Sequence, residues 1–166
     1  MRIRRGFVVL GILACAAAAA HVLRHRPEAG DPPSEAYRFY CIEPGILYRS
    51  GALTKHGTLE EMRALLERHK IRTVVNLVPQ DAGSPSEWYR QEREAVSGAG
   101  AKLVDIPILK SGDPSAAQAD AFVSLLRDPG NRPVLVHCSK GEVRTGALVG
   151  VYLMAFRGMD SEKAFR

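Results

Sequence analysis

The chain has 166 residues, 46% of them hydrophobic and 25% charged, which is the composition of a single globular domain and excludes a largely disordered protein. Five of the 23 lysines and arginines lie in residues 1–26, which contain no acidic residue. The remainder of the chain therefore carries 18 basic and 18 acidic side chains, and this neutral balance argues against a surface that binds nucleic acid.

The N-terminal segment has the layout of an export signal. Arginines precede an uncharged run at residues 6–20, and a basic stretch followed by roughly 7–15 apolar residues is typical of a secretory signal peptide. Three features leave its fate open: Ala17–Ala19 fits a cleavage site, an extension to Leu23 reaches the shortest membrane-spanning length, and Cys15 ends a motif resembling a lipoprotein box. We therefore expect residues 1–26 to be a signal peptide or an apolar membrane-anchor helix, with the rest of the protein on the periplasmic side of a bacterial cell envelope.

A linker and one domain follow this segment. Residues 27–36 hold three prolines, one glycine and three acids, which is typical of a linker, so the domain covers residues 37–166. Hydrophobic periodicity and turn signals predict its elements. In chain order we expect strands at 38–42 and 46–48, a helix at 58–69, a strand at 73–78, a helix at 85–96, a strand at 101–106, a helix at 113–127, a strand at 133–136 and a helix at 144–156.

Three of the expected helices have recognisable starts. Thr58 and Glu61 form a capping box. Pro85 suits the first position of the next helix, and Asp113 is a candidate N-cap for the third.

The alternation of strands and helices predicts an α/β fold with a mostly parallel central sheet flanked by helices. In such sheets ligands bind beyond the carboxyl ends of the strands, and the last expected strand leads directly into His137 and Cys138. The loop after this strand is therefore the expected site. After Gly158, which closes the last long helix, residues 160–166 look like the first turn of a further helix, so the domain is either compact or lacks its last element.

The loop within residues 133–146, PVLVHCSKGEVRTG, carries the chemistry. It turns successive backbone N–H groups towards one point between a strand and a helix, which suits a phosphate. The same N–H groups and the helix dipole stabilise a thiolate, so Cys138 is the expected nucleophile. The residues expected to bind the phosphate are Ser139, Lys140, Gly141, Glu142, Val143 and Arg144.

The motif also predicts individual roles. Arg144, six residues after the cysteine, presents a planar guanidinium that suits two phosphate oxygens. Gly141 allows backbone angles that a side chain would forbid. The hydroxyl of Thr145 is suited to hydrogen-bond the sulfur when a thiophosphate intermediate on the cysteine is hydrolysed. His137 is expected to orient the loop from behind through a buried hydrogen bond.

The sequence HCSKGEVRTG resembles the signature of the cysteine-dependent protein tyrosine and dual-specificity phosphatases, above all the compact bacterial, plant and fungal atypical group with H-C-x-x-G-x-x-R-T-G. The resemblance covers residues 37–158 and includes the stretches PGILYRSG, IRTVVNL and VDIP. It implies a phosphatase-like fold and hydrolysis of phosphate monoesters, on a phosphorylated protein or small molecule, through a phosphocysteine on Cys138. We expect no cofactor, and the sequence has no cluster of residues at metal-ligand spacing.

The general acid is the weak part of this resemblance. Members of the family place an aspartate on a mobile loop shortly after the strand that corresponds to residues 101–106. Here Lys110 occupies the matching position, and the nearest carboxylate belongs to Asp113, which is either the acid or a plain helix N-cap. Asp105, within the expected strand, and Asp81, in an earlier loop, are the other candidates.

Side chains around the motif bear on the substrate. Glu142 adds a negative charge that Lys140 offsets only in part, which favours a phosphotyrosine-like or singly phosphorylated group over heavily phosphorylated inositols. Trp88 and Tyr89 are candidates to flank a substrate ring, but as helix neighbours at least one of them is expected to be core or surface. Arg49 is expected to pair with an acidic residue of the sheet.

Cys41 is the other cysteine of the domain. Outside the cytoplasm it could form a disulfide with Cys138, which would reversibly block the nucleophile. The alternative is a small, buried apolar residue.

Three functions are compatible with the sequence. The first is the phosphatase that the resemblance implies. The second is a pseudophosphatase that binds phosphorylated groups without turnover, which the uncertain acid favours. The third is a sulfurtransferase, whose cysteine loop is generally shorter or lacks the Arg-Thr-Gly ending found here.

Overall fold

The computed structural model describes residues 37–110 and 113–165, so the expected N-terminal apolar segment and linker lie outside the described residues. The strands are β1 (Tyr40–Glu43), β2 (Leu47–Ser50), β3 (Thr73–Asn76), β4 (Lys102–Asp105) and β5 (Val134–His137). The helices are α2 (Leu53–His56), α3 (Leu59–Arg68), α4 (Glu87–Gly98), α5 (Ala116–Arg127), the 3-10 turn η1 (Pro129–Asn131), α6 (Val143–Arg157) and α7 (Ser161–Ala164).

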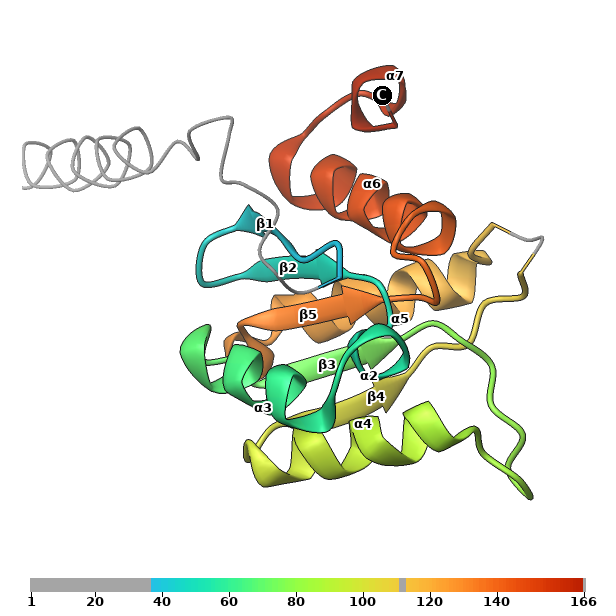
Figure 1. Ribbon diagram of the computed structural model, residues 1–166. Helices are drawn as coiled ribbons and strands as arrows, with labels where there is room; N and C mark the ends of the chain where they lie inside the picture. Colours follow the sequence, from blue (N-terminus) through green and yellow to red (C-terminus); the bar gives the residue numbers. More distant parts are fainter. Residues whose placement is uncertain (1–36, 111–112, 166) are drawn as a thin grey trace, which may run out of the picture. The chain divides into compact units, whose positions relative to one another are not determined.

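The strands form one mixed sheet in the order β1-β2-β5-β3-β4 (Figure 1). β2, β5, β3 and β4 run parallel, and β1 is antiparallel to β2 because a tight turn at Gly45 joins them as a hairpin. The register places the carboxyl ends of the parallel strands together: His137 lies beside both Ser50 and Asn76, and Asn76 lies beside Asp105. The expected mostly parallel sheet, with helices around it, is confirmed.

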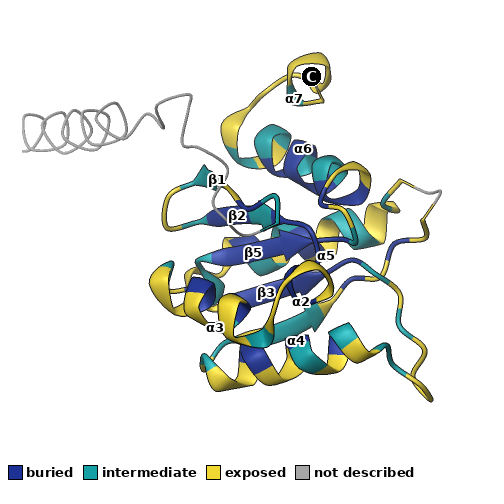
Figure 2. Cartoon of the chain, in the orientation of Figure 1, coloured by how far each residue is buried: buried dark blue, intermediate teal, exposed yellow. Residues whose placement is uncertain are grey.

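Helices cover both faces of the sheet, and for this reason the central strands β3 and β5 are buried along their whole length (Figure 2). Alternating residues of these strands belong to two separate cores. Val75 and Val136 pack with Phe122 of α5 and Tyr152 of α6. The opposite core contains the strand residues Val74 and Leu135 and the helix residues Met62, Leu66 and Val96 of α3 and α4.

One of the expected helix starts is confirmed, and another lies later in the chain than expected. The capping box of α3 forms as predicted, since the backbone N–H of Glu61 donates to Oγ1 of Thr58 at 3.1 Å. α4 begins at Glu87 with Ser86 as its N-cap, two residues later than expected.

The prediction that Asp113 caps the next helix is wrong. α5 begins at Ala116, and its N-cap is Ser115, which forms a reciprocal capping box with Gln118. A serine followed three residues later by glutamine satisfies two backbone donors at once. Asp113, two residues earlier, has no such partner to close the box.

The remaining elements of the described residues are short. α2 and η1 were not predicted, because three or four residues show no hydrophobic periodicity. Gly158 ends α6 in the left-handed conformation, with φ of 62°, as expected, and the predicted opening turn follows as α7. No helix within residues 37–110 and 113–165 is long and apolar enough to span a membrane.

The assignment of the α5 cap predicts different effects for two neighbouring substitutions. Ser115→Ala removes the side-chain acceptor of the cap and is expected to lower the free energy of unfolding by about 1 kcal/mol. Asp113→Ala is expected to leave stability unchanged, because this side chain caps nothing. Urea denaturation of both variants measures the difference, and a larger loss in Asp113→Ala would contradict the assignment.

Candidate active site

The loop between β5 and α6 holds the sulfur of Cys138 at its base. The Cys138 side chain is nearly buried, with 3% of the residue exposed. The backbone N–H of Gly141 donates a hydrogen bond to the sulfur over 3.3 Å. The loop therefore does what the sequence predicts: it turns backbone donors inward, towards the cysteine.

The surroundings of Cys138 favour its thiolate. Burial acts to raise the pKa of the thiol, but the side chain and backbone of Thr145, the backbone N–H of Gly141 and the charge of Arg144 act in the opposite direction. Their combined effect lowers the pKa of Cys138 below its ordinary value. A thiolate is the nucleophilic form of cysteine, so these contacts make Cys138 reactive.

Arg144, in the first turn of α6, lies across the carboxyl ends of neighbouring strands. Its Nη1 donates to the carbonyl of Leu77, which follows β3, at 3.3 Å and to the carbonyl of Ile108, which follows β4, at 3.2 Å. The residue is 8% exposed. A guanidinium has five N–H donors, so these two bonds fix its position and leave others for two phosphate oxygens.

The back of the loop is locked against β2. Gly141 has a φ of 75°, and a Cβ atom at this position would lie 2.5 Å from the carbonyl oxygen of Ser50 and 2.6 Å from the backbone nitrogen of Gly51. Only glycine allows both this backbone conformation and this approach. Arg49 also holds the loop in place, because its Nη2 donates to the carbonyls of Gly141 and Glu142. The expectation that Arg49 pairs with an acidic residue is therefore wrong.

The short helix α2 contributes a lysine that sequence analysis missed. Nζ of Lys55 donates to Oγ of Ser139 over 3.0 Å, and the backbone N–H of Ala52 donates to the carbonyl of Ser139 over 3.2 Å. A cation therefore lies beside the first residue of the phosphate loop. Its only sequence signal is a basic pair, Lys55 and His56, between a strand and a capping box.

The charge of Glu142 is neutralised from an unexpected side. Nη1 of Arg38 forms an ion pair with Oε1 of Glu142 and also donates to the carbonyl of Lys140 at 3.4 Å. The sequence predicts a partial offset of this charge by Lys140, and the structure adds Arg38, just before β1, as an ion-pair partner. With its charge paired in this way, Glu142 argues less strongly against phosphorylated inositols than the sequence alone suggests.

His137 lies behind the cysteine in a buried ion pair. Its Nε2 is 2.9 Å from Oε1 of Glu92 on α4, and both side chains are at most 1% exposed. Burial acts to lower the pKa of His137, but the negative charge of Glu92 and the hydrogen bond to it dominate, so the pKa is raised. The sequence predicts the buried histidine but not its partner, because an acid within an amphipathic helix is ordinarily expected on the exposed face.

The three candidate acids have different surroundings. Asp105 accepts hydrogen bonds from Nδ2 of Asn76 at 2.8 Å and from the hydroxyl of Tyr89 at 2.6 Å, which is a structural network at the end of β4. Asp81 accepts from the backbone N–H of Gly83 at 2.9 Å, and Asp113 is exposed before α5. Within the described part of the chain, none of the three carboxylates forms a hydrogen bond with Cys138.

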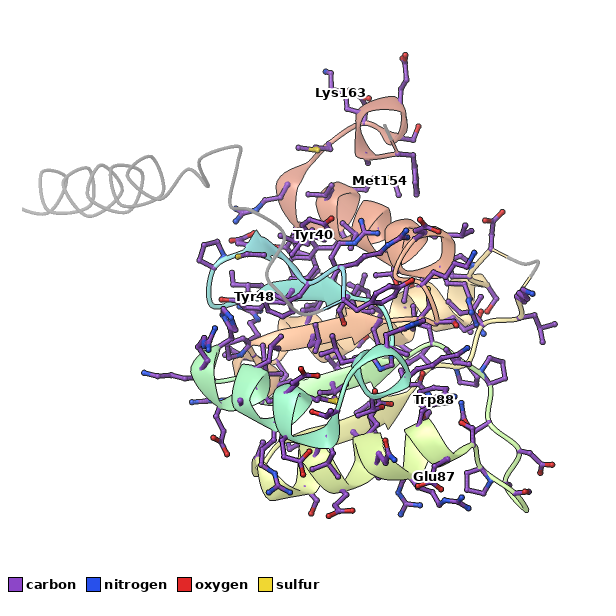
Figure 3. All side chains as sticks on the ribbon, viewed as in Figure 1. Tyr40, Tyr48, Glu87, Trp88, Met154 and Lys163 are labelled. Carbon is purple, nitrogen blue, oxygen red and sulfur yellow. The ribbon has the colours of Figure 1, made fainter. Side chains whose placement is uncertain are left out.

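The neighbouring aromatic residues Tyr89 and Trp88 have different surroundings. Tyr89 is core: burial and its hydrogen bond to Asp105 raise its pKa to about 12. Trp88 is half-buried at the start of α4 (Figure 3), and its carbonyl accepts a hydrogen bond from Thr54 of α2.

Cys41 forms no disulfide with Cys138 and packs half-buried in β1, which is separated from β5 by β2.

Two apolar side chains are exposed beside the loop. Val143 ends the phosphate loop with 71% of the residue exposed, and Leu109 follows Ile108, one of the two carbonyls bound by Arg144, with 73% exposed. We call this pair the apolar rim. As for metals, residues 37–110 and 113–165 contain no group of three or more potential ligands.

The part of the chain that contains the β5–α6 loop matches a known protein family. Residues 43–166 match the family described as a DSP-PTPase phosphatase fused to NAD+ kinase.

Two curated proteins resemble the chain. The dual specificity protein phosphatase TpbA of Pseudomonas aeruginosa (strain UCBPP-PA14) is 27% identical over 143 residues, which covers 84% of this chain and 61% of TpbA. The inositol diphosphatase DSP3 of Arabidopsis thaliana is 30% identical over 131 residues, covering 76% of this chain and 57% of DSP3. The chain thus spans less than two thirds of either relative.

A solved structure confirms the likeness of the fold. The crystal structure of P. aeruginosa TpbA in complex with pTyr matches this domain with a TM-score of 0.52 at 23% sequence identity. The match covers 80% of this chain and 77% of that one.

The close approach of Gly141 to β2 predicts that no side chain is tolerated there. Gly141→Ala is expected to lower kcat/KM by about 100-fold, since a shift of about 1 Å in a catalytic group has this effect, and also to reduce stability. Gly45→Ala is the matched control, because Gly45 has a similar φ of 72° but nothing within 4 Å of the added Cβ. Assays of both variants on p-nitrophenyl phosphate make the comparison. Equal losses would show that backbone strain alone, and not the contact with Ser50, explains the effect.

The buried ion pair predicts a pH effect. Glu92→Gln removes the charge that raises the pKa of His137, so the imidazole loses its proton at lower pH and no longer stabilises the thiolate. The pKa of Cys138 should rise, and kcat/KM should fall more at about pH 5.5 than at about pH 8. Glu94→Gln, at an exposed position of the same helix, serves as the control. A pH profile of Glu92→Gln that is parallel to that of the wild type would refute the coupling.

Proposed function

Because the chain belongs to the family of DSP-PTPase phosphatases described as fused to NAD+ kinase, we propose that it hydrolyses phosphate monoesters through a phosphocysteine intermediate on Cys138. The observation that carries the proposal is the convergence on one sulfur of a lowered thiol pKa, an inward-facing backbone donor and a guanidinium fixed by two carbonyls. This combination supplies both a nucleophile and a binding site for the transferred group.

The reaction proceeds in two displacements. The Cys138 thiolate attacks phosphorus, an S–P bond forms, and the ester P–O bond breaks as the leaving oxygen takes a proton. Arg144 and the loop N–H groups bind the equatorial oxygens of the transferred group, where charge develops. Water then attacks phosphorus and gives a proton to the carboxylate that protonated the leaving oxygen, the S–P bond breaks, and inorganic phosphate leaves. Thr145, whose side chain and backbone act to lower the pKa of Cys138, stabilises the released thiolate.

Asp113 is the proposed donor of the proton to the leaving oxygen. It follows β4 in the chain, on the segment whose Ile108 carbonyl binds Arg144, and it does not cap α5. Its carboxylate is exposed and is not held in a structural network, unlike that of Asp105.

Phosphotyrosine is the proposed substrate group, with the tyrosine side chain as the leaving group. The apolar rim, Val143 and Leu109, offers two exposed aliphatic surfaces beside the cradle, which suit the faces of a ring. TpbA, which is similar in fold, has been crystallised with pTyr, and this supports the same class of substrate here.

A pseudophosphatase is the second candidate function. The observation that favours it is the lack of a hydrogen bond between the candidate acids and Cys138 in the described part of the chain. Such a protein would bind a phosphorylated group in the same phosphate loop and release no phosphate.

Export or attachment to the cell envelope through residues 1–26 also remains a proposal. Its support is the arginine-led apolar run of the sequence. If that segment is retained, it would bring the domain to a membrane surface.

The catalytic roles predict a distinct pattern of losses. The full chain, assayed under reducing conditions with chelator, should hydrolyse p-nitrophenyl phosphate and a phosphotyrosine peptide, and Cys138→Ser should hydrolyse neither. Asp113→Ala should lose about 100-fold on the peptide and far less on p-nitrophenyl phosphate, whose leaving group needs little protonation. Phosphate release measures each rate. A folded wild type that binds the peptide but releases no phosphate would favour the pseudophosphatase.

A further inference from the structure

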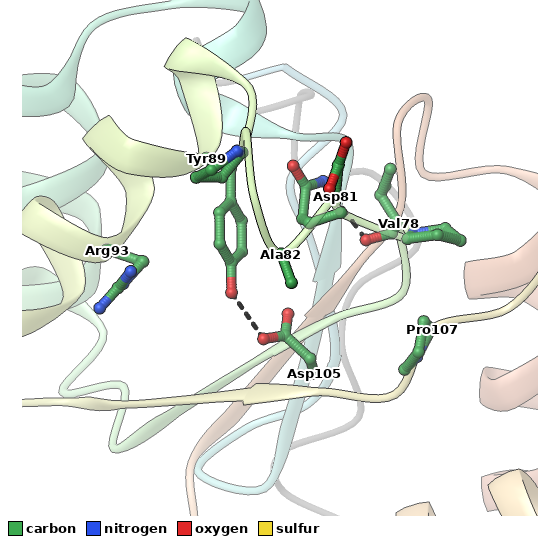
Figure 4. Close-up of a pocket in the computed structure, with 10 residues that line it drawn as sticks. Val78, Asp81, Ala82, Tyr89, Arg93, Asp105 and Pro107 are labelled. Atoms are coloured by element: carbon green, nitrogen blue, oxygen red, sulfur yellow. Dashed lines mark hydrogen bonds between the residues drawn. The ribbon is translucent and has the colours of Figure 1, made fainter.

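A pocket of about 400 Å³ lies at the carboxyl ends of β3 and β4 (Figure 4). It is bounded by the loop between β3 and α4, by the first two turns of α4 and by the end of β4. Prolines and aliphatic residues make up much of its wall, among them Val78 and Pro107. None of the residues of the phosphate loop lines it, so it is a separate feature of the surface.

The pocket is lined by chain neighbours of the residues that Arg144 contacts. The carbonyls that fix this arginine belong to Leu77 and Ile108, and the adjoining residues Val78 and Pro107 line the pocket. In the sheet, β4 is separated from β5 by β3 alone. Two strand spacings amount to about 10 Å, a distance that the residues next to a bound phosphotyrosine can span.

Two carboxylates reach the pocket from different elements. Asp105 comes from the end of β4, and its hydrogen bonds from Asn76 and Tyr89 fix its orientation, although the residue remains exposed. Asp81 comes from the loop after β3 and is also exposed. Arg93, exposed on the second turn of α4, is the cation of the lining. The lining therefore keeps a net negative charge.

We propose that this pocket binds a basic side chain that neighbours the phosphotyrosine of a peptide substrate. The inference rests on the proposed function and deepens it by naming the substrate class. The methylene stem of a lysine or arginine packs on apolar walls while its charged end reaches carboxylates, which matches a pocket with Val78 and Pro107 in its wall and with Asp81 and Asp105. A second phosphate on the substrate would instead meet these two carboxylates, so singly phosphorylated peptides are preferred over polyphosphorylated molecules.

Three phosphotyrosine peptides that differ only in the flanking residue (lysine, alanine or glutamate) test the preference. Wild-type kcat/KM should be at least about threefold higher for the lysine peptide than for the glutamate peptide, the size expected of exposed ion pairs, and this ratio should shrink at high salt. Equal values, or a preference for glutamate, would overturn the proposal.

Two substitutions in the pocket should move the ratio in opposite directions. Asp81→Asn should reduce the lysine-to-glutamate ratio, and Arg93→Gln should increase it, because one removes a negative and the other a positive charge. Arg93→Gln should leave hydrolysis of p-nitrophenyl phosphate unchanged, since that substrate is too small to extend into the pocket. If neither substitution alters the ratio, the preference arises elsewhere and the pocket is not the site.

Binding to Cys138→Ser separates this proposal from the proposed function. Fluorescence anisotropy of the same three peptides, labelled, should show the lysine peptide binding more tightly to Cys138→Ser. If the wild type fails to hydrolyse p-nitrophenyl phosphate while this preference persists, the catalytic proposal fails and the pocket assignment stands. If hydrolysis proceeds and the preference is absent, the pocket assignment alone is wrong.

Discussion

The packing of Gly141 against the backbone of Ser50 and Gly51 is the constraint on which the site depends. Because a Cβ would approach to 2.5 Å from the Ser50 carbonyl, the loop after β5 can sit only in one place relative to β2. The carbonyl of Gly141 accepts a hydrogen bond from Arg49, and its N–H donates to the sulfur of Cys138. Two neighbouring parallel strands thus set the shape of the cradle before any substrate binds, which limits reorganisation during catalysis.

Two sets of charged and polar groups surround the sulfur of Cys138. Arg144, Thr145 and the backbone of Gly141 act to lower the pKa of Cys138, and the buried pair of His137 and Glu92 lies behind it. A buried charge without a partner is costly, so Glu92 makes it possible to keep a charged histidine inside the sheet. The proposed nucleophile is therefore surrounded by charged residues from both faces of the domain.

Sequence reasoning predicted the parts of this arrangement that are local in the chain. The parallel sheet and the position of the loop, which brings Cys138 and Arg144 to the carboxyl ends of the strands, follow from periodicity and from one motif. The contacts made by Arg49, Lys55 and Glu92 could not be predicted in the same way, because each joins the loop or its preceding strand to a residue distant in sequence. A basic or acidic residue alone gives no indication of which distant backbone or side chain it will meet in the fold.

The most direct test of this account is to identify the residue that carries phosphate during turnover. The full chain is mixed with a phosphotyrosine peptide, quenched in acid within the first turnovers, digested and examined by mass spectrometry, alongside Thr145→Ala, in which the intermediate should accumulate. The account predicts phosphate on the peptide that contains Cys138, and none in Cys138→Ser. Phosphate release by an active enzyme without a phosphorylated Cys138 peptide in either protein would contradict it.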